Sequence, residues 1–440
     1  MIMRKLFFSF LLALLMPMTA GAQEMYAVYD GVETFTFYYD NERASRSGMV
    51  YDVKPNLNGK SQWFLADWRE NVKKVVFDAS FADAKPKSTS YWFRELWYLE
   101  KIDGIEYLNT SEVTNMSYMF AYCPYLTGLD VSGFKTDKVT DMRMMFHVCR
   151  SLTNLDVSGF KTGNVTDMNS MFGSCSGLTN LDVTGFKTDN VTDMGGMFSD
   201  CPGLTSLDVT GFKTDNVTNM NSMFNRCSSL TSLDVTGFKT DNVTDMCGMF
   251  YECYGLTSLD VTGFKTDNVK DMSYMFNCCF NLTSLDVTGF KTDNVTNMCC
   301  MFNASSGLTS LDLSSFKTDN VTDMEYMFSW CSGLATIYVG DGWSTAGVQK
   351  SGKMFSDCTN LVGGAGTLYD ENHTDHTYAR IDGGSGNPGY FTAKEEGDGI
   401  STVKAAADKV IWYDMNGRKL QDKPAMKGVY IQNGKKVVIK

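Results

Sequence analysis

Apolar and polar positions recur with a period of 26 residues from about residue 113 to residue 339. A typical copy reads VTDMGGMFSDCPGLTSLDVTGFKTDN and begins at Val191. Its Met-Phe pair returns at 119/120, 145/146, 171/172, 197/198, 223/224, 249/250, 275/276, 301/302 and 327/328, and once more, one residue out of step, at 354/355. A fixed period of this length predicts a solenoid, in which each unit buries its apolar face only against its neighbours.

Two kinds of apolar spacing alternate within each copy. Met142, Met145, Phe146 and Cys149 stand at i, i+3, i+4 and i+7, which is one face of a two-turn helix. The apolar positions of residues 152–157 are typical of a short strand that enters a parallel sheet. The sequence therefore predicts an α/β repeat solenoid, with a parallel sheet on one side, short helices on the other and small β units at both ends.

The ends of the chain differ from the repeat. Residues 1–22 combine a basic start, a short apolar run and the small residues Ala20-Gly-Ala22. This pattern predicts a signal peptide cleaved after Ala22, and thus an exported protein at the cell surface or outside the cell. No later segment approaches about twenty uninterrupted apolar residues, so we expect no transmembrane span.

The remaining sequence divides into four predicted parts. Residues 23–90 predict an N-terminal β capping unit, and residues 91–362 the solenoid. Residues 363–395 predict a C-terminal cap and linker. Residues 396–440 alternate apolar and polar positions around Asn416-Gly417 and Asn433-Gly434, which favour hairpin turns, so they predict a small β domain.

Charge narrows the class of partner. The chain has 39 basic and 51 acidic residues, a net charge of −12, which disfavours nucleic acid and anionic membranes. A basic partner, or one bridged by cations, is electrostatically favoured. With three histidines in the whole chain, histidine-based acid–base catalysis has little support.

The motifs resemble known families. The strand motif Leu-x-x-Leu-x-Val is that of leucine-rich repeats, and the longer phrase Asn-Val-Thr-x-Met-x-x-Met-Phe-x-x-Cys-x-x-Leu-x-x-Leu-Asp-Val resembles the BspA-like repeat of bacterial surface proteins. The tail motifs beginning at Tyr413, Lys427 and Asn433 resemble the C-terminal sorting domains of Bacteroidetes proteins. The first resemblance implies an adhesin for host matrix or other bacteria, and the second implies passage to the cell surface.

One column of carboxylates is a candidate binding face. The aspartate of Leu-Asp-Val lies between two inward-facing residues and should point outward. It recurs as Asp130, Asp156, Asp182, Asp208, Asp234, Asp260, Asp286 and Asp312. Neighbouring carboxylates about 5 Å apart repel by roughly 0.8 kcal/mol in water. Bound Ca²⁺ or the column of lysines from Lys135 to Lys317 would offset this repulsion; a solvated ladder without ligand is the alternative that we favour.

Specific recognition must come from positions at which the copies differ. These are the two residues between the methionines and the two after Phe, where aromatic residues gather near the ends of the array. The candidate contacts are Tyr118, Tyr274, Tyr326 and Trp330. Packing beneath the end caps is the alternative role for such side chains.

The cysteines form a column of their own, from Cys123 to Cys279, on the inward face, which favours buried thiols over disulfides. Cys278 and Cys300 lie off this column and are a candidate disulfide between neighbouring copies. The segment His373–His376 has metal-binding residue types in a loop-like setting, and a loop without metal is the favoured interpretation.

We therefore expect a cell-surface or secreted binding protein that is not an enzyme and has no cofactor. Its partner would be a host extracellular-matrix protein, a glycan or another bacterium, held by many weak equivalent contacts. A structural envelope spacer without ligand is the first alternative, and a secreted glycan-active enzyme with paired aspartates the second. The sequence leaves the ligand and the oligomeric state open.

Overall fold

The computed structural model describes residues 22–55 and 59–394, and in the tail residues 412–413, 419–420, 428–432 and 435–439. The chain divides into two compact units, Met1–Lys394 and Glu395–Lys440. The predicted signal peptide, apart from Ala22, lies outside the described residues, so its cleavage stays a prediction.

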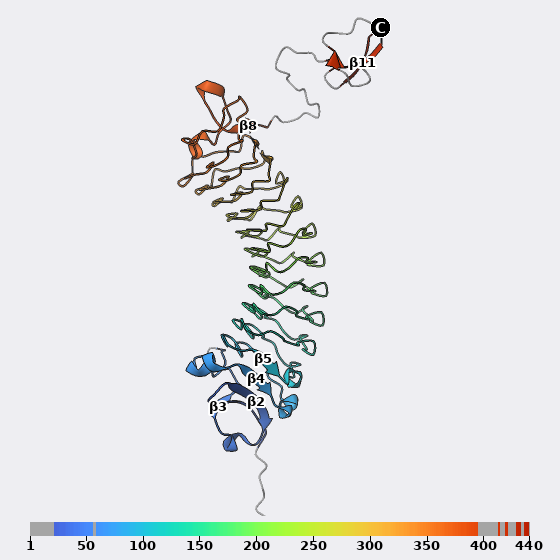
Figure 1. Cartoon of the computed structure of the whole chain (residues 1–440), viewed down its shortest axis with the longest axis vertical. Coiled ribbons are helices and arrows are strands. Elements are labelled where there is room, and N and C mark those ends of the chain that lie inside the picture. Colours follow the sequence, from blue (N-terminus) through green and yellow to red (C-terminus); the bar gives the residue numbers. More distant parts are fainter. Residues whose placement is uncertain are drawn as a thin grey trace, which may run out of the picture. The chain divides into compact units, whose positions relative to one another are not determined.

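A five-stranded sheet begins the first unit (Figure 1). Its order is β3-β1-β2-β4-β5, with antiparallel pairs on the β3 side of β2 and parallel pairs from β2 to β5. The strands are β1 (Glu24–Tyr29), β2 (Thr34–Asp40), β3 (Met49–Asp52), β4 (Lys74–Phe77) and β5 (Lys101–Asp103). The parallel side continues into the coils, so this sheet covers the edge that the first coil would otherwise expose.

Short 3-10 helices complete the connections of this unit. They are η1 (Arg43–Ser45), η2 (Asp67–Asn71), η3 (Ala79–Asp83), η4 (Ile105–Tyr107), η5 (His376–Tyr378) and η6 (Gly384–Gly386). The first four belong to the N-terminal end and the last two to the C-terminal cap.

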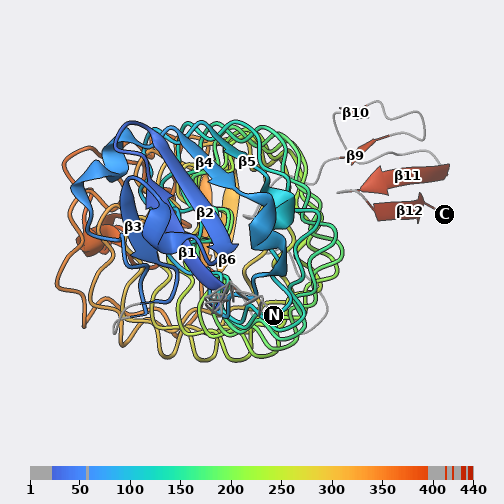
Figure 2. The same cartoon turned by 90° about the horizontal axis from the view of Figure 1, so that it is seen from below.

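The repeats form a stack of parallel coils, which confirms the predicted solenoid. Isolated parallel bridges join each coil to the next, from Asn115–Asp141 through to Asp323–Lys350. Viewed from below, the coils overlap in part, each displaced from the one before it (Figure 2). Regular strands appear only at the C-terminal end of the array, where β6 (Ser310–Leu313), β7 (Thr336–Val339) and β8 (Phe391–Ala393) form a parallel sheet. Between β5 and β6 the described residues form no strand.

The expected two-turn helices are wrong: the described residues contain no α-helix, and the Met-Phe segment is a run of turns. The backbone N–H groups of this segment alternate between two acceptors. Met171 donates to the carbonyl three residues back, whereas Ser170 and Phe172 donate to the next coil, to Gly195 and Met197, at 2.8 and 3.0 Å. An α-helix would keep all these bonds within one segment; the turns share them between coils.

This alternation requires two left-handed residues in every coil. In the coil of Phe172, they are Ser170 (φ 51°) and Ser174 (φ 58°), and equivalent pairs recur along the array. Most of these residues are not glycine, and one, Val148, is β-branched, although the left-handed region costs such residues roughly 1–2 kcal/mol each. The hydrogen bonds and packing between coils must offset this cost.

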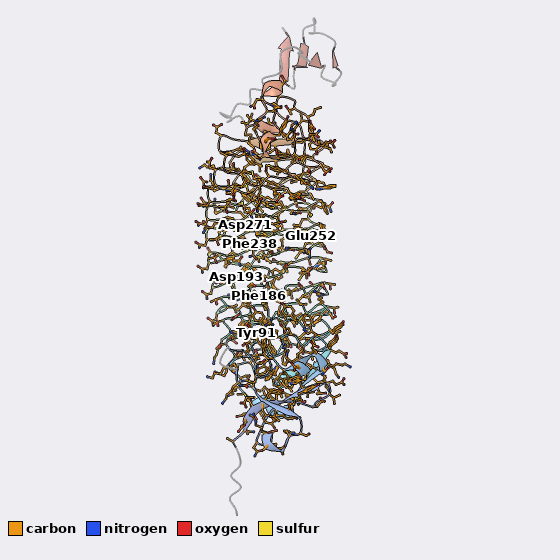
Figure 3. All side chains as sticks on the ribbon, turned by 90° about the vertical axis from the view of Figure 1, so that its left-hand side faces the viewer. Tyr91, Phe186, Asp193, Phe238, Glu252 and Asp271 are labelled. Atoms are coloured by element: carbon orange, nitrogen blue, oxygen red, sulfur yellow. The ribbon has the colours of Figure 1, made fainter. Side chains whose placement is uncertain are left out.

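The core is a stack of identical side chains. Phe146 and Phe172 lie with ring centroids 5.7 Å apart and planes 6° apart, and the same stacking runs from Phe93 to Phe355. The methionines, valines and leucines of each copy are buried around it. Figure 3 shows equivalent residues of different coils in register, such as Phe186 with Phe238.

A buried threonine joins each coil to the next. Thr214 Oγ1 accepts the N–H of Lys239 at 2.7 Å and donates to the carbonyl of the same residue at 2.9 Å. Equivalent buried threonines are Thr136, Thr162, Thr188, Thr240, Thr266, Thr292 and Thr318. One hydroxyl thus satisfies two backbone groups of the neighbouring coil.

The second unit is a small antiparallel sheet of order β10-β9-β11-β12. Its strands are β9 (Trp412–Tyr413), β10 (Lys419–Leu420), β11 (Gly428–Gln432) and β12 (Lys435–Ile439). Gln432 pairs with Lys435. The predicted hairpin turns at Asn416-Gly417 and Asn433-Gly434 lie outside the described residues. The sorting role of this unit stays a prediction.

Replacing Thr214 by Val tests the coupling between coils. Val has nearly the shape of Thr but leaves the N–H and carbonyl of Lys239 without their partner, so we expect a loss of about 1–3 kcal/mol in the free energy of unfolding. Denaturant unfolding measures it. The matched control is Thr205→Val, at an exposed threonine of the same coil, which should change stability little; equal losses in both variants would contradict this role.

Candidate ligand-binding face

The eight aspartates of the Leu-Asp-Val column cap their own loops, because an aspartate two residues before a serine or threonine readily closes an Asx turn. Asp208 Oδ1 accepts the N–H of Thr210 at 3.0 Å and its hydroxyl at 2.6 Å. The other members make the same pair of bonds: Asp130, Asp156, Asp182, Asp234, Asp260, Asp286 and Asp312. We call these eight residues the aspartate face.

These hydrogen bonds also control the charge of the face. The hydroxyl and then the N–H of the residue two positions on lower the pKa of Asp130, Asp156, Asp182, Asp208, Asp234 and Asp260 below the usual value. At Asp156 the neighbouring Asp130 and Asp182 act in the opposite direction, but their effect is smaller. At these six positions the local turns therefore favour the ionised carboxylate.

Asp312 differs from the other members of the column. It is half-buried, and Lys394 Nζ lies 2.7 Å from its Oδ2. Burial acts to raise its pKa, but Lys394 and Ser314 together lower it. The C-terminal end of the aspartate face is thus closed by an ion pair from the cap, while the other seven side chains are exposed.

Open grooves run across the aspartate face. One, of about 410 Å³, extends from Asn180 to Asp234, and the next, of about 440 Å³, extends from Ser232 to Asp286. They share Ser232, Leu233 and Asp234, so their linings are continuous across five coils. Each coil contributes an aspartate and a hydroxyl residue, and the first four also contribute the edge of a leucine, which makes a repeated surface of acid, hydroxyl and apolar groups.

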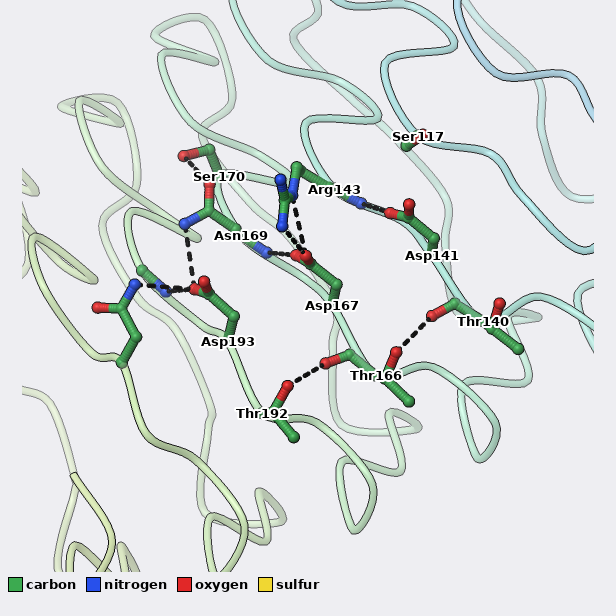
Figure 4. A network of polar contacts seen from close by, with 12 residues as sticks. Ser117, Thr140, Asp141, Arg143, Thr166, Asp167, Asn169, Ser170, Thr192 and Asp193 are labelled. Atoms are coloured by element: carbon green, nitrogen blue, oxygen red, sulfur yellow. Dashed lines mark hydrogen bonds and ion pairs between the residues drawn. The ribbon is translucent and has the colours of Figure 1, made fainter. Parts of the chain in front are cut away.

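A second column of Asp and Asn was not predicted as a site. Asp141, Asp167 and Asp193 form the bridges between coils and are half-buried, and Figure 4 shows them linked by side chains. Asn169 Nδ2 donates to Asp193 Oδ1 at 3.1 Å, and Arg143 Nε to Asp167 Oδ2 at 2.9 Å. The sequence signal was present, since an Asp or Asn stands two residues after a buried valine of each copy, as in Val139–Asp141 and Val165–Asp167, but it was not assigned to a site.

This second column is electrostatically unlike the aspartate face. Burial is the main cause that raises the pKa of Asp141, and the charge of Asp167 adds to it. Asp141 Oδ1 accepts the backbone N–H of Arg143, and Asn115 Nδ2 donates to its Oδ2. These groups satisfy one another within the stack, so the column supports the fold.

The four aromatic candidates all occupy left-handed positions of the turns: Tyr118, Tyr274, Tyr326 and Trp330 have φ between 56° and 60°. Trp330 and Tyr274 are 60% and 40% exposed. Tyr118 is half-buried and stacks on Tyr91 with ring centroids 4.7 Å apart. The structure does not gather the four into one site, and none of them lines the grooves of the aspartate face.

The column of cysteines is buried and unpaired. Cys201 Sγ donates to the carbonyl of Phe172 at 3.1 Å, and burial raises the pKa of this thiol to about 12. Ser305, which stands in the same column, makes the equivalent bond to Phe276 at 2.6 Å. The position therefore requires a small buried donor.

The predicted disulfide between Cys278 and Cys300 is not formed, and both residues are free thiols. They occupy the two different left-handed positions of their coils. The sulfur next to Cys300 Sγ is that of Cys299, at 3.5 Å.

Metal ligands do not converge in the described part of the chain, where no group of three or more His, Cys, Asp or Glu residues could hold an ion. His373 stacks on Tyr378 with centroids 4.3 Å apart, and His376 Nδ1 lies 2.7 Å from Ser351 Oγ. The two histidines thus have separate packing partners. Whether Ca²⁺ binds along the aspartate face stays an open prediction.

The lowered pKa values predict acid sensitivity. A carboxylate whose pKa is lower in the folded than in the unfolded state stabilises the fold above the unfolded pKa, and this contribution is lost as pH falls through the folded pKa. We expect the free energy of unfolding to fall below about pH 4. In the triple variant Asp208→Asn, Asp234→Asn, Asp260→Asn the fall should be shallower, because Asn still closes the turn but does not titrate. An unchanged pH profile would contradict the assignment.

Comparisons with solved structures return leucine-rich repeat proteins at low similarity. A leucine-rich repeat protein from Bacteroides ovatus is 16% identical over 77% of this chain and 92% of its own, with a TM-score of 0.36. One from Eubacterium ventriosum is 14% identical over 80% and 97%, with a TM-score of 0.31. A leucine-rich cell surface protein from Faecalibacterium prausnitzii is 16% identical over 78% and 92%, with a TM-score of 0.31.

None of the curated proteins compared with the chain matches it significantly. Among the residues that the structure describes, no helix has the length and apolar character needed to span a bilayer. The family described as "Mycoplasma protein of unknown function, DUF285" matches residues 87–206, 178–284 and 255–367. Because these overlapping matches run over more than half of the chain, the protein belongs to the DUF285 family.

Proposed function

We propose that the chain is a cell-surface or secreted bacterial binding protein that holds a protein or glycan partner along the aspartate face. The observation that carries the proposal is the continuous pair of grooves from Asn180 to Asp286, lined at every coil by an exposed carboxylate and a hydroxyl residue and at four of the five coils by a leucine edge. A surface that repeats in this way suits many weak equivalent contacts, which add up through avidity.

The outer oxygen of each carboxylate is the group offered to the partner. In the described residues, the hydrogen bonds to these aspartates within their own loops use Oδ1, and Oδ2 of Asp312 binds Lys394. A row of Oδ2 atoms can accept hydrogen bonds from sugar hydroxyls or from the Lys and Arg side chains of a basic protein. The net charge of −12 favours the same classes of partner.

The same features argue against catalysis by the aspartate face. An acid and a base need environments that move their pKa values apart, and the exposed members of the column have equivalent surroundings. Each is held by the same two hydrogen bonds from the residue two positions on. A non-enzymatic role therefore forms part of the proposal.

The proposed location of the protein rests on sequence patterns. Export rests on residues 1–22, and surface attachment rests on the resemblance of the tail to Bacteroidetes sorting domains and of the repeats to BspA-like surface proteins. Both follow from sequence patterns. A binding face of this kind acts on host matrix or on other cells only if the chain reaches the outside.

The proposal is tested by binding of the purified chain to immobilised host matrix proteins and glycans, with Ca²⁺ and with chelator. We expect saturable binding that the triple variant Asp208→Asn, Asp234→Asn, Asp260→Asn weakens at least about tenfold, because three equivalent contacts are lost together. Loss of binding in chelator would place bridging cations on the face.

The matched control removes the same charge elsewhere on the same coils. Asp215, Asp241 and Asp267 are exposed and lie outside the residues that line the grooves. Their triple change to Asn should leave binding nearly unchanged. Equal weakening of binding by both triple variants would mean that the loss comes from the change in net charge and not from the aspartate face. Absence of binding under every condition would favour a structural envelope spacer.

A further inference from the structure

A separate hollow lies at the N-terminal end of the array, where the coils meet the capping sheet. It has a volume of about 640 Å³, larger than either groove of the aspartate face. Trp97, Tyr98 and Tyr125 line it together with Pro124. We call it the aromatic hollow.

Its aromatic side chains are exposed yet held in fixed orientations. Trp97, Tyr98 and Tyr125 are 40%, 51% and 55% exposed. Tyr98 and Tyr125 stack with centroids 5.9 Å apart and planes 8° apart, so both rings share one orientation. Trp97 packs against Tyr122 at 5.6 Å, and Tyr122 in turn meets the edge of His147. Rings supported in this way can receive a ligand with little loss of conformational freedom.

The fixed spacing of the coils builds this cluster. Trp97, Pro124 and Arg150 occupy equivalent positions of three successive coils, and Tyr98 and Tyr125 occupy the position that follows. The first of these steps is 27 residues and the second is 26, so the same rows continue despite the irregular first copy. Neighbouring backbones in such a stack lie about 4.8 Å apart, which lets the rings of Tyr98 and Tyr125 stack.

Polar groups of three kinds complete the lining. Arg150 and Ser151 come from the third coil, and Glu70 comes from η2 of the capping unit. A guanidinium, a hydroxyl and a carboxylate therefore stand beside the exposed rings. Together they can both donate and accept hydrogen bonds in several directions.

This combination of exposed rings and polar groups favours one class of ligand over others. An aliphatic peptide side chain would cover the rings but would leave the hydrogen-bonding groups of Glu70, Arg150 and Ser151 unused. A simple anion would meet the carboxylate of Glu70 and gain little from the rings. A pyranose has an apolar C–H face for an aromatic ring and a rim of hydroxyls for charged and hydroxyl groups, so it matches both parts of the lining.

We propose that the aromatic hollow is a carbohydrate subsite that binds a neutral hexopyranose unit of a glycan, with its C–H face on Trp97 or Tyr125 and its hydroxyls on Glu70, Arg150 and Ser151. The inference deepens the proposed function, since it rests on the chain being a binding protein and names one class of ligand. It places that ligand at a site distinct from the aspartate face.

A second aromatic pair on the same row supplies a matched control. Phe280 and Tyr254 stack with centroids 5.1 Å apart, and Phe280 is 42% exposed. They occupy the row of Trp97, Pro124 and Arg150, several coils further on. Phe280→Ala therefore removes a comparably exposed ring from the same face of the array while leaving the aromatic hollow intact.

The test measures binding of the full chain to a panel of soluble neutral polysaccharides, such as glucans, mannans and galactans, by affinity electrophoresis and tryptophan fluorescence. We expect at least one polysaccharide to bind and to perturb tryptophan emission. Trp97→Ala and Tyr125→Ala should each weaken binding about tenfold or more, as expected of central aromatic contacts. Trp97→Phe should restore most of the affinity, and Phe280→Ala should leave it unchanged.

The outcomes separate this inference from the proposed function. Loss of binding in Trp97→Ala, with full binding in the triple aspartate variant, supports the subsite and contradicts a role of the aspartate face in holding that glycan. Loss in the triple variant only overturns the subsite and leaves the proposed function standing. Failure of every polysaccharide to bind, or binding of apolar peptides in their place, also overturns the subsite.

Discussion

The equal length of the coils is the constraint on which the rest of this structure depends. A period of 26 residues brings each buried side chain onto its counterpart in the next coil. Phe172 therefore stacks on Phe198, and the hydroxyl of Thr188 forms hydrogen bonds with the backbone of Lys213 in the next coil. No coil could bury its apolar face alone, and stability must accumulate from contacts between neighbours. At both ends of the array the step is 27 residues, from Phe93 to Phe120 and from Phe328 to Phe355, and the rings still stack, so one extra residue is tolerated there.

The interior and the surface of the coils are therefore under different constraints on their sequence. Inside, the Cys column accepts Ser305 because the hydroxyl makes the same bond to a phenylalanine carbonyl. The left-handed positions accept residues as different as Gly196, Ser222 and Trp330, because the hydrogen bonds that their N–H groups donate to the next coil fix the backbone whatever the side chain is. These positions can therefore vary in sequence without altering the stack, which leaves the outer surface free to carry binding groups.

The sequence indicated the solenoid and its buried columns, since periodic Met, Phe, Cys and Leu positions can pack in register in few other ways. It did not reveal the turns. The spacing of Met142, Met145, Phe146 and Cys149 fits a helix, and the same spacing also fits a run of turns whose N–H groups alternate between their own coil and the next. The choice depends on the neighbouring coil, which a local pattern does not contain.

The candidate sites could be predicted only in part. The outward direction of the aspartates followed from the two inward residues beside each of them, but the Asx turns that hold them did not enter the prediction, although the Asp-x-Thr spacing is their usual signal. The aromatic hollow was missed because Tyr98 and Tyr125 are 27 residues apart and Glu70 lies in the capping unit. Such a site becomes visible only when the cap and the first coils are placed together.

Excision of one whole coil tests the central claim most directly, namely that identical coils carry the fold and add up to a binding face. Removal of residues 191–216 places Val217 where Val191 was and keeps every column in register. The account predicts a chain that still unfolds cooperatively and binds its partner on the aspartate face more weakly with each coil removed. Loss of folding on excision, or an affinity independent of the number of coils, would contradict it.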